Sequence, residues 1–399
     1  MSDDASERII VIGAGSTGSS ISYNLTKSGQ QVVLIDRGQI AQGMTGLSSA
    51  IIRTHYSNET VAKMALYSIE QLRLMSSETG FVASGFLILS PSRYANAIKS
   101  SVAMLRRLGA DEITHTQKEA RKMFPLVNFD DVDCIAYEPK SGYADPVATT
   151  TLYANRAKES GAQILLGLEV DRFRVKNGEA KSILLTNGRE LHGAKFIVCT
   201  NIWTNQLLAR SGVAEDKLLP LKIVPHPVVV YRRPDSLRGT LPIIADYRSK
   251  AYYKPEGQVL LMGGSLDARL DKTSVSPDEF PTRASEEYVE KFSEGLVTRM
   301  EAMRNGRVQT SYYGLYDTTP DEHPILDELS ALGLSNVYAC VGLSGHGFKL
   351  CPAFGVMLTE MILGYEKSQR TFDWSIFSLS RFTKRQEIQR RYEGIGTVA

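Results

Sequence analysis

Cysteine is scarce in this sequence, and the few copies follow no binding pattern. The 399 residues include only four, Cys134, Cys199, Cys340 and Cys351, and no two of them have the Cys-x-x-Cys spacing of zinc or redox sites. The six histidines show no metal-ligand spacing either. We therefore expect free thiols and no metal. A small scaffold held by disulfides or zinc is excluded, because a chain of this length can bury a large core.

Long apolar runs and an excess of charge of one sign are also missing. The longest apolar runs, such as residues 9–12, fall far short of the roughly 20 residues that cross a bilayer, and the polar residues 1–8 contain no apolar signal region. The net charge is +2, and no basic stripe offers a surface to nucleic acid. These absences predict a cytoplasmic protein with no transmembrane segment and no nucleic-acid partner.

The first forty residues contain a dinucleotide-binding pattern. An apolar β-branched strand is followed by the turn Gly13-Ala14-Gly15-Ser16-Thr17-Gly18, then a helix, then a second apolar strand that ends in Asp36. The first glycine allows the tight turn, the second lets the backbone approach a pyrophosphate, and the third lets helix and strand pack closely. The helix N-terminus faces the phosphates. Asp36 is placed to accept hydrogen bonds from a ribose.

The stretch after Asp36 indicates which dinucleotide binds. A nicotinamide domain normally continues into another compact helix and strand. Here residues 38–56 form a long stretch rich in glycine, serine and threonine, which suits a larger cofactor. The sequence also contains only one such fingerprint. A dehydrogenase that depends on NAD is therefore disfavoured.

A second glycine-rich turn, Gly342-Leu343-Ser344-Gly345-His346-Gly347, precedes a helix that begins near Phe348-Lys349. The unpaired N–H groups at this helix start favour negative charge. Reduced flavin concentrates negative charge near N1 and C2=O, so this turn is a candidate partner for a flavin ring. A close-packed turn beneath a C-terminal helix remains the alternative.

Two cations, two tyrosines and one histidine are candidates for substrate chemistry. Arg53 and Lys349 each lie in a glycine-rich stretch, and two such cations can hold a carboxylate between them. Tyr252 and Tyr316 can form the wall of a site for a small amine, and His346 is a candidate acid or base. Each also has an ordinary alternative as a surface charge, a core aromatic residue or a structural histidine.

The remaining pattern alternates between α/β and strand-rich segments. Residues 164–200 predict a β-meander that returns to a buried strand, and residues 221–316 predict several strands interrupted by one helix over 284–303. The pattern therefore predicts a chain that passes between two domains, with an α/β class of fold that is α+β overall.

Five ordered segments together resemble the D-amino-acid-oxidase superfamily of FAD enzymes. The nearest branch contains the sarcosine oxidases and the β subunits of sarcosine oxidase and dye-linked L-proline dehydrogenase. The segments are residues 13–18 with Asp36, Ile51-Ile52-Arg53-Thr54-His55-Tyr56, Gly142-Tyr143-Ala144-Asp145-Pro146, Gly314-Leu315-Tyr316-Asp317-Thr318-Thr319-Pro320-Asp321 and residues 342–349.

This resemblance implies a Rossmann-like FAD-binding domain interleaved with an antiparallel-sheet substrate domain. We place the first in residues 1–84, 145–215 and 319–399, and the second in residues 85–144 and 216–318. The expected FAD contacts are Gly13, Gly15, Ser16, Gly18, Asp36, Arg37, Ser48, Ser49, Val170, Thr200, Gly345, Gly347, Phe348 and Lys349.

The resemblance also implies an activity, namely oxidation of a small secondary or N-methylated amino acid by hydride transfer to flavin N5, giving an imine that hydrolyses. Arg53 and Lys349 match positions that hold the substrate carboxylate, and Tyr316 matches a tyrosine in the site wall. Tyr252 and His346 complete the catalytic residues that we expect. The sequence leaves sarcosine, dimethylglycine, proline and a D-amino acid open as substrates.

Two departures from the family pattern qualify this expectation. Gly314 stands where monomeric sarcosine oxidases carry the cysteine that bonds the flavin, so we expect noncovalent FAD. Leu261 stands where those oxidases place an oxygen-activating lysine, so rapid reaction with oxygen is in doubt. Oxygen, a quinone and a dye-type carrier remain open as acceptors, as do a homo-oligomer and a hetero-oligomer. The alternative function is a flavoprotein subunit that relays electrons within a hetero-oligomeric dehydrogenase, with little activity alone.

Overall fold

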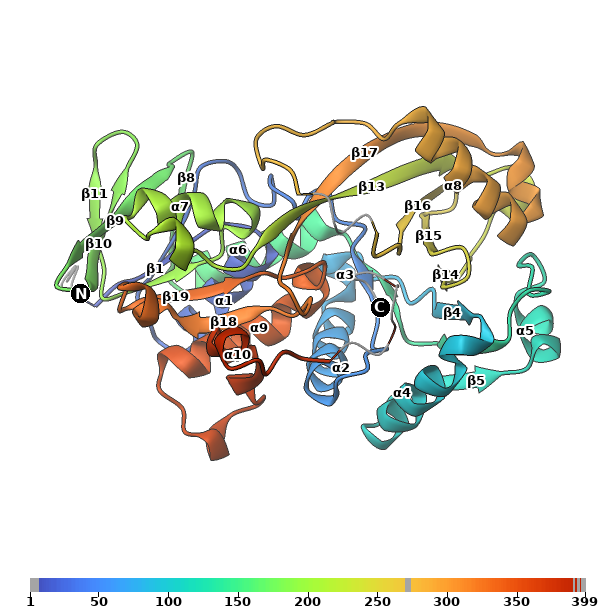
Figure 1. The fold of residues 1–399 in the computed structure, drawn as a ribbon, viewed down its shortest axis with the longest axis horizontal. Coiled ribbons are helices and arrows are strands. Elements are labelled where there is room, and N and C mark those ends of the chain that lie inside the picture. Colours follow the sequence, from blue (N-terminus) through green and yellow to red (C-terminus); the bar gives the residue numbers. More distant parts are fainter. Residues whose placement is uncertain (1–6, 270–273, 390–391, 393–394, 396–399) are drawn as a thin grey trace.

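The chain folds around two separate large sheets that lie side by side along its length (Figure 1). This computed structural model describes residues 7–269, 274–389, 392 and 395. Within that part of the chain, no helix has both the length and the apolar character needed to cross a membrane.

The first sheet has six strands in the order β18-β19-β12-β1-β2-β8. All neighbours are parallel except β18 and β19, which pair antiparallel. The strands are β1 (Ile9–Ile12), β2 (Val32–Asp36), β8 (Gln163–Leu166), β12 (Lys195–Val198), β18 (Ile325–Glu328) and β19 (Val337–Val341). β1 is buried along its whole length, as expected of a parallel strand that is covered on both faces.

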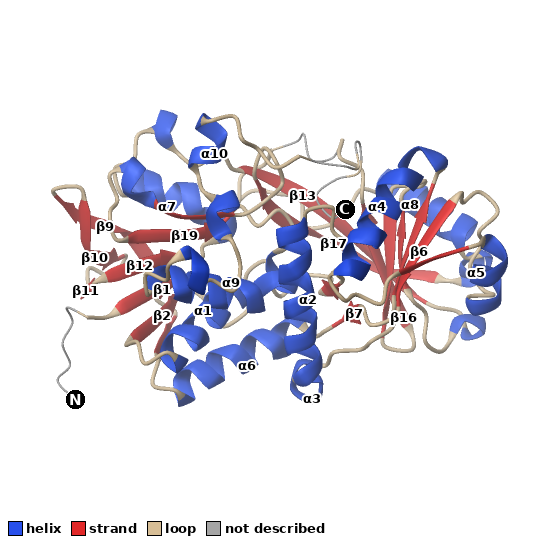
Figure 2. Cartoon of the chain, turned by 90° about the horizontal axis from the view of Figure 1, so that it is seen from below, coloured by secondary structure: helices blue, strands red, loops and turns tan. Residues whose placement is uncertain are grey.

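Alternate residues of β1 and β2 pack into two different cores. One face packs against the helices α1 (Ser16–Lys27) and α9 (Gly347–Ile362), with α6 (Pro146–Glu159) beside α1 (Figure 2). The other face packs against a three-stranded meander and α7 (Thr204–Arg210). The meander consists of β9 (Val170–Lys176), β10 (Glu179–Leu185) and β11 (Glu190–His192).

The second sheet has eight strands in the order β17-β13-β16-β15-β14-β4-β6-β5. Every neighbouring pair is antiparallel except β14 and β4. The strands are β4 (Phe86–Ser90), β5 (Ile113–His115), β6 (Cys134–Glu138), β13 (Lys222–Arg232), β14 (Ile243–Asp246), β15 (Ala251–Glu256), β16 (Leu260–Ser265) and β17 (Arg307–Thr318). Helix α8 (Glu286–Arg299) covers one face and α4 (Ala95–Arg107) covers the other.

Short elements connect the two sheets. The two-stranded ladder of β3 (Ile51–Ile52) and β7 (Gly142–Tyr143) lies beside α2 (Glu59–Leu74) and α3 (Ser76–Thr79). Helix α5 (Gln117–Met123) follows β5, and α10 (Ser380–Thr383) lies near the end of the chain. The long strands β13 and β17 extend from the second sheet toward the first, which brings their residues close to the glycine-rich turns (Figure 1).

The predicted α/β class of fold is confirmed, with small differences at element ends. The helix expected over residues 284–303 ends as an α-helix at Arg299 and continues as a 3-10 turn, Glu301–Asn305. The sequence pattern identified most of the meander. It did not mark β15 and β17 as separate strands, because both contain several polar and tyrosine residues.

Candidate functional site

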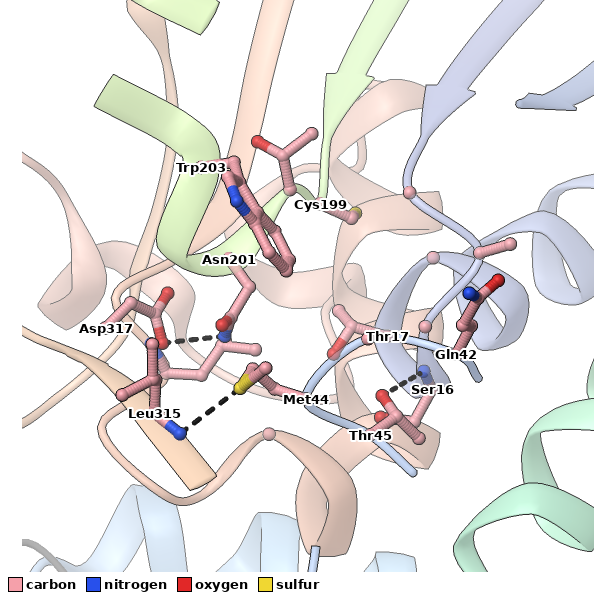
Figure 3. Close-up of a pocket in the computed structure, with 18 of the residues that line it drawn as sticks. Ser16, Thr17, Gln42, Met44, Thr45, Cys199, Asn201, Trp203, Leu315 and Asp317 are labelled. Carbon is pink, nitrogen blue, oxygen red and sulfur yellow. Dashed lines mark hydrogen bonds between the residues drawn. The ribbon is translucent and has the colours of Figure 1, made fainter. Parts of the chain in front are cut away.

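Residues from both sheets line one cavity of about 780 Å³. Both glycine-rich turns face this cavity, as do the stretch of residues 42–49 and the ends of β13, β15 and β17. Every residue predicted to contact FAD lies in its wall: Gly13, Gly15, Ser16, Gly18, Asp36, Arg37, Ser48, Ser49, Val170, Thr200, Gly345, Gly347, Phe348 and Lys349. Figure 3 shows part of this wall, with Ser16 bound to Thr45 at 3.2 Å and Met44 beside Leu315.

The first glycine turn is sterically built for close backbone contact. A Cβ on Gly18 would lie 1.9 Å from the carbonyl oxygen of Gly13, and Gly13 itself has a φ of 112°. Because Gly18 has no side chain, the start of α1 can pack directly against the turn that follows β1. Gly15 is the N-cap of α1 and provides no side-chain cap, so the start of the helix faces the cavity with its peptide groups.

Asp36 closes the same end of the cavity. Its two carboxylate oxygens accept hydrogen bonds from the N–H groups of Ala14 and Gly38, each at 2.7 Å. The carboxylate is thereby fixed at the end of β2, beside the turn, where the fingerprint requires a partner for a ribose. Arg37 follows and stacks on the ring of Trp203 at 4.2 Å.

The second glycine turn is held by a buried carboxylate. Asp317, at the end of β17, accepts hydrogen bonds from the N–H groups of Gly342 and Leu343 at 2.6 and 3.1 Å, and from Asn201 Nδ2 at 2.8 Å (Figure 3). Burial raises the pKa of Asp317 to about 7, against the opposing effect of these hydrogen bonds. Helix α9 then begins at Gly347 without a side-chain cap, so its N-terminus also faces the cavity.

Lys349 provides positive charge at this end of the cavity. It is only 6% exposed, and its Nζ donates to the carbonyl oxygen of Gly345 at 2.9 Å. Among the described residues, no carboxylate lies within ion-pair distance of it. Burial and the nearby charge of Arg53 hold the pKa of Lys349 well below its usual range. An anion that enters the cavity would favour the charged lysine.

Arg53 and His346 lie near the cavity but not in its wall. The guanidinium of Arg53 donates to the carbonyl of His55 and stacks on the ring of Tyr56 at 4.2 Å. His346 Nδ1 lies 3.0 Å from the hydroxyl of Tyr56. The ring of His346 is thus turned toward Tyr56 rather than into the cavity wall, and its catalytic role stays a prediction.

His226 is a cavity residue that the sequence did not identify. Its ring stacks between Tyr316 at 4.6 Å and Tyr252 at 5.8 Å. Its Nε2 is buried and has no hydrogen-bond partner in the described structure. Burial and the charge of Lys349 lower the pKa of His226 to about 4, so the ring is neutral at pH 7.

Tyr252 and Tyr316, the two tyrosines predicted for the site wall, both line this cavity. Gly264 makes room for this group, because a Cβ there would lie 2.8 Å from the Tyr252 ring and 2.9 Å from His226 Nε2. No local signal marks His226, which reaches the cavity through the pairing of β13 with β17.

The two departures from the family pattern have different outcomes. Gly314 lines the cavity, as expected for the position of a flavin-bonding residue. Leu261 does not, because it packs with Tyr253 and Phe292 on the opposite face of β16. The structure thus places Leu261 away from the cavity, and its correspondence to the oxygen-activating lysine stays a prediction.

The sequence matches the family "DAO: FAD dependent oxidoreductase" over residues 8–361, and this protein belongs to that family. The residues present fit FAD, because the uncapped starts of α1 and α9 and the glycines of both turns border the same cavity.

Known proteins support the same assignment. Human mitochondrial sarcosine dehydrogenase is 24% identical over 372 residues, which cover 89% of this chain and 39% of that protein. The chain thus spans about two fifths of the length of that relative. Monomeric sarcosine oxidase from Arthrobacter sp. is 24% identical, covering 95% of this chain and 97% of that protein. The crystal structure of L-proline dehydrogenase from P. horikoshii superposes with a TM-score of 0.86 at 26% identity, covering 96% of this chain and 99% of that chain.

Proposed function

We propose that this protein oxidises a small amino acid with a secondary or N-methylated amine, of the sarcosine, dimethylglycine or proline type. One observation carries the proposal: the cavity joins a dinucleotide cradle to a short polar end formed by Lys349, His226, Tyr252 and Tyr316. When bound, FAD supplies the hydride acceptor at N5. The imine product then hydrolyses in water.

The polar end of the cavity fits the two charged groups of an amino acid. We assign the carboxylate to Lys349, with the charge of Arg53 behind it. We assign the amine to the neighbourhood of the neutral His226 ring, which lines this end of the cavity. Because its pKa is low, His226 orients the amine rather than acting as a strong base. The rings of Tyr252 and Tyr316 limit the size of the substrate.

Removal of the Lys349 ammonium tests this assignment. We expect Lys349→Ala to raise KM by about 10- to 100-fold, the usual range for a lost hydrogen bond to a charged group. The matched control is Lys222→Ala, which removes an exposed lysine at the start of β13. Equal KM values for the two variants would contradict the assignment.

We further propose that residues 1–84, 145–215 and 319–399 hold FAD, and that residues 85–144 and 216–318 complete the substrate end of the cavity.

We also propose that FAD is bound noncovalently. Gly314 offers no side chain, and burial raises the pKa of the Cys199 thiol in the cavity wall, so reactive thiolate is scarce there. Acid precipitation is expected to leave the flavin in the supernatant. Flavin that remains with the precipitated protein would contradict this.

A second candidate function is that of a flavoprotein subunit within a larger assembly. The similarity to the mitochondrial pyruvate dehydrogenase phosphatase regulatory subunit of Mus musculus, 23% identical over 375 residues, favours it. The two functions differ in a simple way, because only the first predicts that the isolated chain reduces its own flavin with an amino acid.

A further inference from the structure

A network of buried polar side chains lies behind Arg53, outside the cavity wall. His55 is at its centre and is fully buried. Its Nδ1 lies 2.6 Å from Glu112 Oε1, and its Nε2 lies 2.7 Å from the hydroxyl of Tyr392. That hydroxyl also lies 2.9 Å from Ser101 Oγ. The network joins the β3–α2 connection, α4, the residue before β5 and Tyr392.

The contact between His55 and Glu112 is a buried ion pair. Burial alone lowers the pKa of His55, but the charge of Glu112 and its hydrogen bond, with further contributions from Tyr392 and Glu138, raise it to about 10. The protonated ring donates from both nitrogens, to Glu112 and to the Tyr392 oxygen. Because a buried charge without a partner is costly, this pairing fixes the orientation of the ring.

Glu138 belongs to the same cluster and holds the backbone. His55, Glu112 and Glu138 each offer a potential metal ligand, and these atoms lie within 4.8 Å of one another. The Glu138 oxygens, however, accept hydrogen bonds from the N–H groups of Thr54 and His55 at 2.7 and 2.8 Å, and from Thr54 Oγ1 at 2.7 Å. Glu138 is therefore engaged by the two peptides that follow Arg53, whereas Glu112 Oε2 is buried without a hydrogen-bond partner among the described residues.

This held backbone determines where Arg53 points. The guanidinium donates to the carbonyl of His55, whose N–H and ring are both fixed by the network. It also stacks on Tyr56, whose hydroxyl contacts His346 at the turn before Lys349. A shift of the His55 backbone would therefore move the positive charge of Arg53 relative to Lys349.

We propose that Tyr392 and the pair of His55 and Glu112 are positioning residues that keep Arg53 beside Lys349 and so set the affinity for the substrate carboxylate. This inference rests on the proposed function. Tyr392 is 337 positions from His55 in the chain, and nearby Ile395 forms an antiparallel bridge with Asp267. Tyr392 thus acts on the carboxylate site from a distant position in the chain.

The test uses Tyr392→Phe in the full-length protein loaded with FAD. The change keeps the ring, which packs edge-on against Tyr94 and Tyr247, and leaves His55 Nε2–H buried without its acceptor. Two quantities are measured: KM for the amino acid that bleaches the flavin best, and the Kd of propanoate, a carboxylate without an amine, from the change in flavin absorbance. We expect both to rise about tenfold, with kcat within about twofold of wild type and FAD content unchanged.

A matched control removes a comparable hydroxyl elsewhere. Tyr231→Phe deletes a buried hydroxyl that bonds Ser293 Oγ at 2.8 Å in the core beneath α8, and propanoate affinity is expected to stay unchanged. Ser101→Ala is a milder second variant, which removes the other partner of the Tyr392 hydroxyl and is expected to raise the Kd by about threefold.

Three results would overturn or redirect the inference. If Tyr392→Phe leaves propanoate affinity within about twofold of wild type while Lys349→Ala weakens it, the positioning role is wrong and the proposed function stands. If Tyr392→Phe lowers kcat, FAD content and thermal stability together without changing propanoate affinity, the residue is merely structural. If Lys349→Ala leaves propanoate affinity unchanged, the carboxylate assignment itself fails.

Discussion

The pKa of His226 links a single residue to the stability of the protein. An ordinary histidine titrates near 6.5, whereas burial and Lys349 lower the pKa of His226 to about 4 in the folded chain. Between these two pH values the unfolded chain binds a proton that the folded chain does not. The contribution of His226 to the free energy of unfolding is therefore fully present above about pH 6.5 and is lost as the pH falls toward 4.

This linkage gives a measurable difference. Between pH 7 and pH 5, His226 is expected to reduce the free energy of unfolding of the flavin-free protein by about 2 kcal/mol. Chemical denaturation of the wild type and of His226→Asn at both pH values measures this contribution. An equal loss in the two proteins would show that His226 is not held neutral by its surroundings.

The residues at the two ends of the cavity differed in how far the sequence could predict them. Asp36 and Gly18 belong to a local pattern of turn, helix and strand, and the structure places them as that pattern requires. Arg53 was predicted from its type and its neighbourhood, but sequence does not specify where a long side chain points. His226 was missed because its position depends on the pairing of strands that are far apart in sequence.

At the scale of elements, the second glycine turn depends on the end of β17. Asp317 binds three N–H donors of the turn and of Asn201, so removal of its carboxylate would leave these buried groups without an acceptor. We expect Asp317→Ala to weaken FAD binding by tenfold or more and to lower the melting temperature. Titration of the apoprotein with FAD, followed by flavin fluorescence, measures the first effect.

The control for this change is Asp235→Ala, which removes a carboxylate in an exposed 3-10 turn of the second sheet, where the side chain is 85% exposed. It is expected to leave FAD affinity unchanged. If Asp317→Ala binds FAD as tightly as Asp235→Ala does, the turn does not need the carboxylate and our account of its geometry is wrong.

The prediction of elements succeeded where the apolar pattern was continuous and local. The apolar strands β1 and β2 and the helix between them followed directly from the sequence. β17 was harder to recognise, because its first half is exposed or partly exposed and contains polar residues. Strand pairing with β13 overrides that local signal.

At the scale of the whole molecule, the two sheets contribute different parts of one site. The parallel sheet ends in two glycine-rich turns whose geometry is set by backbone, and the antiparallel sheet provides His226, Tyr252 and Tyr316 through its side chains. The interleaved course of the chain was predictable from the order of its motifs. The convergence of these parts on one cavity was not, since it depends on how the two sheets pack.

The most direct test of the central claim is anaerobic reduction of the FAD-loaded protein by a panel of amino acids that includes sarcosine, dimethylglycine and proline, followed by admission of air. We expect at least one secondary or N-methylated amino acid to bleach the flavin absorbance near ~450 nm, a general property of the oxidised flavin ring, and glycine to do so far more slowly. The rate of recovery in air then distinguishes an oxidase from a dehydrogenase. If the isolated protein binds FAD and no amino acid bleaches it, the proposed reaction is contradicted and the role of a flavoprotein subunit is favoured.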